Sequence, residues 1–141
     1  MIQNQRQYNA TKAQIARLED ALQASKSAKE KMPARVYKAM VAGIRSQIDE
    51  MQAELSEYDE LASSTELHLG SVDDLPAALI KARIARGYTQ KELAEKLDIK
   101  PQQIQRYEAS GYRAASLERV LRIMRALDLE LEADLVLKPD S

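Results

Sequence analysis

The chain has 141 residues, which fits one domain or two small ones, and it contains no Cys, which excludes disulfides and thiolate metal sites. Few Gly and Pro residues, 4% aromatic residues and 30% charged residues favour a mainly helical soluble protein. The net charge of −1 conceals a basic stretch, because residues 81–125 carry eleven Lys or Arg against five Asp or Glu.

Residues 1–64 carry apolar or small side chains at alternating spacings of three and four, the pattern of packed helices. The pattern breaks in a polar segment at Pro33, which disfavours helix in the preceding residue and fits the start of the next one. We therefore expect an antiparallel, coiled-coil-like helical hairpin, with pairing to another chain as the alternative. The seam positions are Tyr8, Thr11, Ile15, Leu18, Leu22 and Ser25, followed by Tyr37, Val41, Ile44, Ile48, Met51, Leu55, Tyr58 and Ala62.

The expected hairpin is nearly neutral, since residues 1–66 hold nine Lys or Arg and ten Asp or Glu. Such a segment has no electrostatic attraction for phosphate, so we interpret it as a protein-interaction arm rather than a DNA reader. It would either bind a foreign partner or serve only for dimerisation. Residues 65–73, which include Gly70, are expected to form a linker.

Residues 74–137 are expected to form a second domain of four short helices and one C-terminal β-strand. The first helix should end at Gly87, the second should begin at Thr89, the third should span Pro101–Ala109, and Ser116 should cap the fourth. In residues 129–137 four leucines and Ala133 alternate with three acids and Val136, a period of two that is typical of a half-buried strand. The predicted fold class is therefore mainly α with a single strand.

The second and third of these helices, joined by a turn at residues 98–100, predict a helix-turn-helix. In such a unit one helix crosses the DNA backbone and the next lies in the major groove, where base edges are read by hydrogen bonds. Gln can pair with adenine, and Arg or Lys can pair with guanine. No acid occurs in residues 99–107. The polar side of the third helix offers Lys100, Gln102, Gln103 and Arg106.

Residues 79–108 resemble the Cro and phage-repressor family, also called the xenobiotic-response-element family. The resemblance is carried by Thr89-Gln90, by Glu92-Leu93-Ala94 and by the pattern Ile-x-Arg-Tyr-Glu at residues 104–108. It implies a lambda-repressor-like four-helix domain that binds double-stranded DNA. By this resemblance the DNA-binding candidates are Thr89, Gln90, Lys100, Gln102, Gln103, Arg106 and Arg113, with Gln90 directed at a phosphate.

The same resemblance pairs Arg83 with Glu108 in an internal salt bridge. Two residues depart from the family pattern. Pro101 stands where a polar residue often reads a base, and Asp98 replaces the usual glycine of the turn, which requires Asp98 to accept a left-handed conformation. Specificity at the position of Pro101 is therefore expected to be lost or shifted.

The expected function is sequence-specific transcriptional regulation, in the form of an autorepressing antitoxin similar to the HigA and HipB sort. The C-terminal strand would pair two copies into a homodimer on a palindromic operator, and the N-terminal hairpin would bind a toxin. The alternative is a solitary or phage-type repressor whose hairpin serves dimerisation or scaffolding.

Catalysis is not expected, because the chain has one His, four Gly and neither a nucleophile–base set nor a glycine-rich phosphate loop. The lone His68 is interpreted as a solvated linker residue. We therefore expect no cofactor and no metal. The absence of a signal-like N-terminal segment and of a long apolar run favours the cytoplasm over a membrane.

Overall fold

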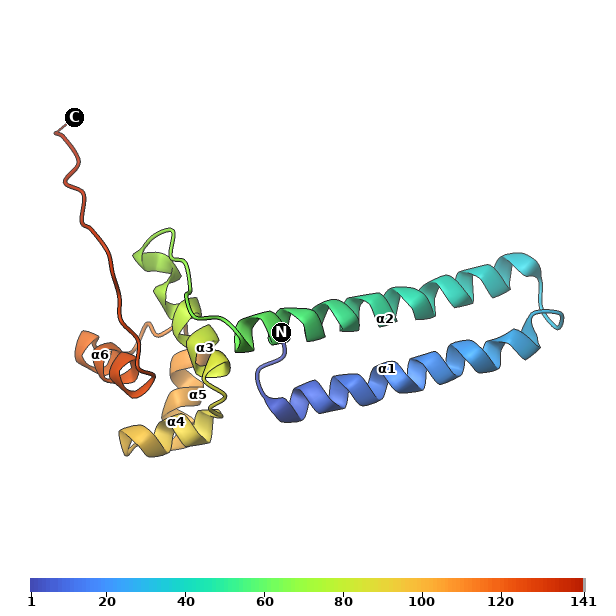
Figure 1. Ribbon diagram of the computed structural model, residues 1–141, viewed down its shortest axis with the longest axis horizontal. Helices are drawn as coiled ribbons and strands as arrows, with labels where there is room; N and C mark the ends of the chain where they lie inside the picture. The colour runs from blue at the N-terminus through green and yellow to red at the C-terminus, as the bar shows by residue number, and fades with distance from the viewer. Residues whose placement is uncertain (141) are drawn as a thin grey trace. The chain divides into compact units, whose positions relative to one another are not determined.

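A computed structural model describes residues 1–140 and is mainly helical (Figure 1). The chain divides into two compact units. The first contains Met1–Leu67 together with Ile84–Thr89, and the second contains His68–Arg83 and the chain from Gln90 onward. Within the described residues, none of the helices has both the length and the apolar character needed to cross a membrane.

The N-terminal segment forms the expected antiparallel hairpin of helix α1 (Gln5–Ser25) and helix α2 (Ala34–Ala62), with a short 3-10 turn η1 (Lys26–Ala28) after α1. Asn4 caps α1 by accepting a hydrogen bond from the backbone N–H of Gln7. Pro33 immediately precedes α2, as its position in the sequence predicts. At the open end of the hairpin, the rings of Tyr8 and Tyr58 lie 5.1 Å apart.

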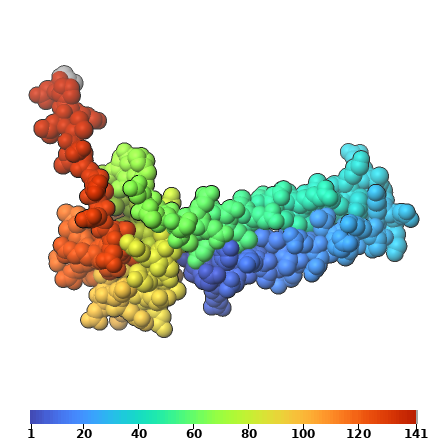
Figure 2. Space-filling view, in the orientation of Figure 1, coloured from blue at the N-terminus to red at the C-terminus, as the bar shows by residue number. Residues whose placement is uncertain are grey.

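The seam of the hairpin is sparsely buried. Ile15 and Ile48 are 7% and 8% exposed, whereas most other apolar seam side chains remain partly accessible. In a hairpin of two helices each seam side chain is covered by only one neighbouring helix. The partial exposure of the apolar seam therefore follows from the presence of only two helices. The space-filling view shows α1 and α2 in contact along the hairpin (Figure 2).

The second unit begins with the 3-10 turn η2 (Val72–Asp74), which continues into α3 (Leu75–Ala85). Helices α4 (Gln90–Leu97), α5 (Pro101–Ala109) and α6 (Leu117–Ala126) follow and agree closely with the four helices predicted from the sequence. Their shared core is fully buried, and each such side chain contributes about 1.5–3 kcal/mol relative to exposure. Its largest apolar members are Leu79, Leu93, Ile104, Ile123 and Leu127.

Local caps explain where several of these elements begin. Ser116 accepts a hydrogen bond from the backbone N–H of Arg119 at 3.1 Å, as predicted for the start of α6. Asp74 accepts hydrogen bonds from the backbone N–H groups of Gly70 and Ser71 at 2.9 and 3.2 Å. This second cap lies at the end of the expected linker and was not predicted. It orders the chain directly before α3.

The predicted C-terminal strand is wrong. Residues 129–140 have no strand pairing, and no β-strand occurs anywhere in residues 1–140. From residue 130 onward every described side chain is exposed, with Leu135 at 99% (Figure 2). A strand needs a neighbour to receive its backbone hydrogen bonds, and the described chain supplies none. The alternating residues 129–137 therefore lie in an extended tail and not in a sheet.

A strained turn follows α5. Gly111 and Tyr112 both adopt left-handed backbone conformations, with φ of 63° and 61°, a conformation that is uncommon for a tyrosine. The Tyr112 ring is buried and lies 5.8 Å from the ring of Tyr107. Its hydroxyl is buried and has no hydrogen-bond partner among the described residues. Burial, reinforced by the charge of Glu108, raises the pKa of Tyr112 above its ordinary 10.0.

We expect Tyr112→Phe to preserve or raise the free energy of unfolding, by up to about 1 kcal/mol, because it removes a buried hydroxyl that lacks a partner. Tyr8→Phe is the matched control. It removes a hydroxyl that donates to Asp59 Oδ2 at 3.2 Å and should be neutral or slightly destabilising. Urea unfolding measures both. A loss of more than about 1 kcal/mol for Tyr112→Phe would show that the hydroxyl does have a partner.

Candidate nucleic-acid interface

The turn between α4 and α5 reverses the chain within three residues. Asp98 adopts the left-handed conformation expected of it, with φ of 55°. The backbone N–H of Ile99 then donates to the carbonyl of Ala94 at 3.0 Å, which closes the C-terminus of α4. Lys100 is extended, and Pro101 occupies the first turn of α5, where its missing N–H removes no helical hydrogen bond.

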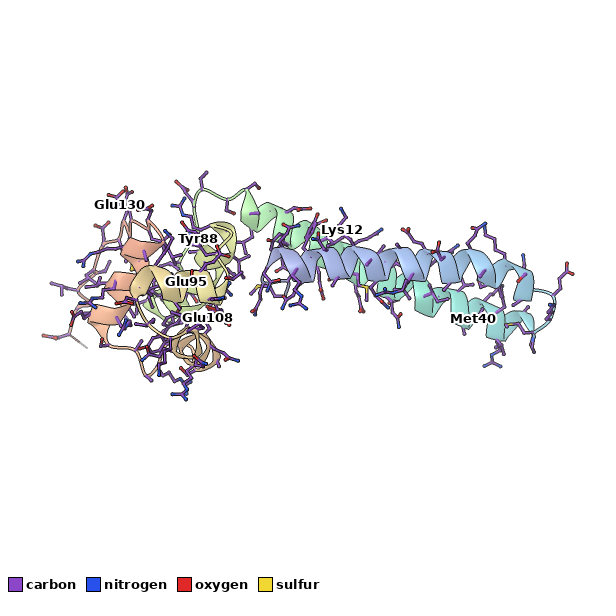
Figure 3. All side chains as sticks on the ribbon, turned by 90° about the horizontal axis from the view of Figure 1, so that it is seen from below. Lys12, Met40, Tyr88, Glu95, Glu108 and Glu130 are labelled. Carbon is purple, nitrogen blue, oxygen red and sulfur yellow. The ribbon has the colours of Figure 1, made fainter. Side chains whose placement is uncertain are left out.

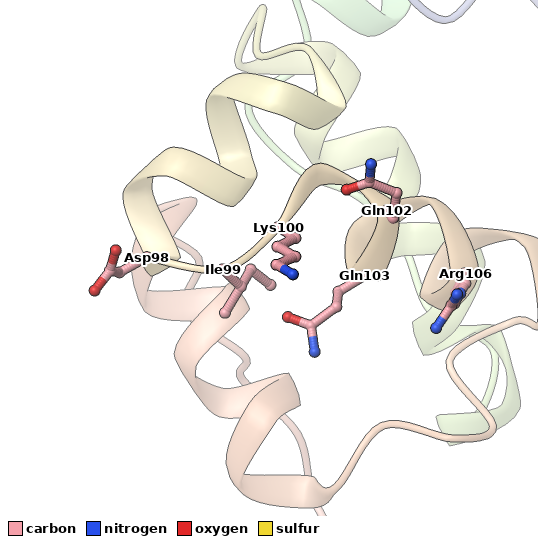
Figure 4. Close-up of a pocket in the computed structure, with 6 residues that line it drawn as sticks. All are labelled: Asp98, Ile99, Lys100, Gln102, Gln103 and Arg106. Atoms are coloured by element: carbon pink, nitrogen blue, oxygen red, sulfur yellow. The ribbon is translucent and has the colours of Figure 1, made fainter.

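Burial of Ile104, which is fully inaccessible, sets the inward face of α5. The opposite side therefore faces solvent. There the structure brings together four of the predicted DNA-binding residues around an open depression (Figure 4). Asp98 and Ile99, which were not among the predicted DNA-binding residues, also line it. The lining residues are Asp98, Ile99, Lys100, Gln102, Gln103 and Arg106.

The side chains around this depression carry complementary recognition chemistry. Lys100, Gln103 and Arg106 project from the turn and α5 toward its open side, whereas the carboxylate of Asp98 points away from them (Figure 4). The open side thus presents two cations and the amide group of Gln103, which suit phosphates and base edges. Ile99 adds an apolar surface that fits the methyl group of thymine. Its place in a turn gave no periodic signal from which to predict it.

Three other candidates do not line the depression. Thr89 immediately precedes α4, Gln90 is its first residue, and Arg113 is exposed in the turn after α5. Gln90 Nε2 donates to Glu108 Oε1 at 3.1 Å. A phosphate contact by Gln90 must therefore use the second hydrogen of its amide.

Arg83 and Glu108 meet inside the second unit. Arg83 Nε donates to Glu108 Oε2 at 2.8 Å, and Arg83 Nη2 donates to Glu108 Oε1 at 2.9 Å. The two side chains are only 2% and 6% exposed. This bidentate ion pair joins α3 to α5, and Gln90 adds α4 to the same carboxylate.

Residues 79–133 match the family model described as Helix-turn-helix. No curated protein and no solved structure matches the chain. Helices α4 and α5 and the turn between them all lie within the matched range. Residues 79–133 are therefore similar to helix-turn-helix domains.

The buried ion pair generates a stability prediction. We expect Glu108→Gln to lower the free energy of unfolding by about 3 kcal/mol, because it removes the carboxylate charge that is paired with the buried guanidinium of Arg83. Glu118→Gln is the matched control. Glu118 and Arg122 are 3.5 Å apart but 78% and 57% exposed, so its loss should change stability by less than about 0.5 kcal/mol. Equal unfolding midpoints for the two variants would contradict the prediction.

Proposed function

We propose that this protein is a sequence-specific regulator of transcription that reads double-stranded DNA with α5. In this proposal Gln102, Gln103 and Arg106 contact base edges, and Lys100 contacts the backbone beside them. The observation that carries the proposal is the open depression on the helix-turn-helix, lined by these four residues. Bidentate contacts of this kind discriminate between bases by about 1–3 kcal/mol each.

The distribution of charge supports this assignment. Residues 81–125, which include the helix-turn-helix, carry eleven Lys or Arg against five acids, while residues 1–66 taken together are nearly neutral. Attraction to phosphate is therefore concentrated on the domain that carries the proposed reading helix. Thr89, Gln90 and Arg113 would position the domain on the backbone at its margins.

The proposal includes a homodimer on a palindromic operator. One recognition helix contacts only a few base pairs, and two copies related by a two-fold axis read half-sites about one helical turn apart. Binding of such an operator within a promoter represses transcription by excluding the polymerase. The protein would act in the cytoplasm, where it meets chromosomal DNA.

A narrower form of the proposal is an autorepressing antitoxin whose hairpin binds and neutralises a toxin. The observation that favours it is the partly open apolar seam on a helical unit whose near-neutral charge does not attract DNA. Met40 adds an adaptable side chain beside this seam. The other form is a solitary repressor whose hairpin serves self-association.

The reading helix is tested by alanine substitution against duplexes selected from a random pool by the wild-type protein. Gln103→Ala and Arg106→Ala should each weaken binding to the selected site by about 1–3 kcal/mol and relax base preference at one position. Gln105→Ala is the matched control, since Gln105 is exposed on the same helix but outside the depression, and it should bind normally. Unchanged affinity of Arg106→Ala at matched salt would refute the assignment.

The antitoxin form makes a separate prediction. Co-expression with the product of an adjacent toxin-like gene should relieve growth arrest, and Val36→Asp with Met40→Asp should abolish this relief, because both charges enter an apolar part of the hairpin surface. Operator affinity of the same double variant should stay at the wild-type level, measured by fluorescence anisotropy. Full neutralisation by the double variant would exclude this surface as the toxin site.

A further inference from the structure

The two ends of the hairpin carry opposite charge. We define the tip half as residues 18–48, which contain the connection between α1 and α2, and the base half as residues 1–17 and 49–66. The tip half holds six Lys or Arg against three acids, and the base half holds three against seven acids. Figure 3 labels Met40 in the tip half and Lys12 in the base half. The tip cations are Lys26, Lys29, Lys31, Arg35, Lys38 and Arg45.

This distribution is carried by α2 and by the connection before it, and it opposes the dipole of α2. In α1 the order is reversed, with three cations in the base half and two acids in the tip half. Neither α1 nor α2 has an acidic residue in its first turn or a basic residue in its last turn. Helix dipoles favour the reverse arrangement, with acids at the N-terminus and bases at the C-terminus. In α2 the cations Arg35 and Lys38 lie near the start, and Asp59 and Glu60 lie near the end. The dipole of α2 therefore does not account for the charge pattern of this helix.

The charges are also available to a partner. The six tip cations are all exposed, as are the acids of residues 49–60. Among the described hairpin residues no ion pair forms within 4.0 Å. The excess positive charge of the tip half and the excess negative charge of the base half thus remain on the surface. The partly open seam lies between the same two helices, so charge and apolar surface occur together.

We propose that a second copy of this chain packs its hairpin antiparallel against the first and forms a four-helix bundle. The two-fold axis would place each basic tip half beside the acidic base half of its partner, twice in every dimer. The second hairpin would cover the open side of the seam. Parallel packing would instead oppose like charges at both ends. Self-association of the hairpin does not depend on base reading, so the two assignments can fail independently.

The orientation has a measurable consequence. Helix α2 has 29 residues and is therefore about 43 Å long at ~1.5 Å per residue. In the antiparallel dimer the two tips lie about one hairpin length apart. In a parallel dimer they would lie side by side, at the ~10 Å that separates packed helix axes. The chain contains no Cys, so a single introduced Cys gives one label site per copy.

The first experiment uses full-length Ser27→Cys, which lies in η1 at the tip, carrying a spin label. Double electron–electron resonance should give one inter-copy distance near the length of the hairpin, about 40 Å. A short distance between the two labels would overturn the antiparallel arrangement. A monomer at micromolar concentration would overturn the proposal altogether and would leave the hairpin to a foreign partner such as a toxin.

The second experiment compares two charge variants of the full chain. The tip variant carries Arg35→Glu and Lys38→Glu, which reverse the charge of the tip half. The base variant carries Arg6→Glu and Arg17→Glu, which add acid to the base half. Both variants change the net charge of the chain by the same amount. The tip variant should dimerise about tenfold more weakly at low salt, whereas the base variant should dimerise at least as well as the wild type. Rising salt should weaken the wild-type dimer and narrow this difference.

Arg35 and Lys38 lie near the N-terminus of α2, where glutamate is favoured, so the tip variant should retain its helix content in circular dichroism. A second variant, Glu54→Lys with Glu57→Lys, adds positive charge to the base half. Mixing it with the tip variant should restore dimerisation, because in the mixed dimer the acidic tip half of one chain lies beside the more basic base half of the other. Equal weakening of the tip and base variants would overturn the proposal, since only net charge would then matter. Operator binding is measured on the same samples as a separate readout.

Discussion

A single buried carboxylate organises the helix-turn-helix unit. Glu108 lies in the last turn of α5 and accepts hydrogen bonds from Arg83 on α3 and from Gln90 at the start of α4. Both charges of the ion pair are almost completely removed from water. Any slide or rotation of α5 that broke these bonds would separate two buried opposite charges, at a cost of several kcal/mol. The position of α5 relative to α3 and α4 is thereby restricted.

That restriction determines which side chains α5 presents. Ile104 and Glu108 are four residues apart and therefore lie on one face of the helix, which the core and the ion pair hold inward. Gln103 and Arg106 then occupy the exposed side, together with Lys100 from the turn (Figure 4). The polar surface of the depression is thus a consequence of a hydrophobic contact and an ion pair on the other side of the same helix.

The sequence predicted those features that depend on neighbouring residues. Pro101, Ser116 and Asp98 mark a helix start, a cap and a left-handed turn through local geometry, and the structure places each of them so. The sequence did not predict two features that depend on a partner far away in the chain. Alternation at residues 129–137 states which side chains could share a face but not whether a second strand exists to pair with. Likewise, the hydrogen bond from Gln90 to Glu108 links residues 18 positions apart, and no local pattern reports it.

The connection between the two units limits how a hairpin dimer could present its reading helices. In the antiparallel bundle the two C-terminal ends of α2 are about one hairpin length apart, roughly 43 Å. Half-sites one turn apart on DNA are separated by about 34–36 Å. Seven residues, 63–69, lie between α2 and the cap made by Asp74, and at about 3.3 Å each they span at most ~23 Å. Two such segments together are longer than the difference between the distance of the two α2 ends and the distance of the two half-sites. An antiparallel hairpin dimer is therefore compatible with a one-turn operator. In such a dimer the length of this segment would limit the half-site spacings that can be reached.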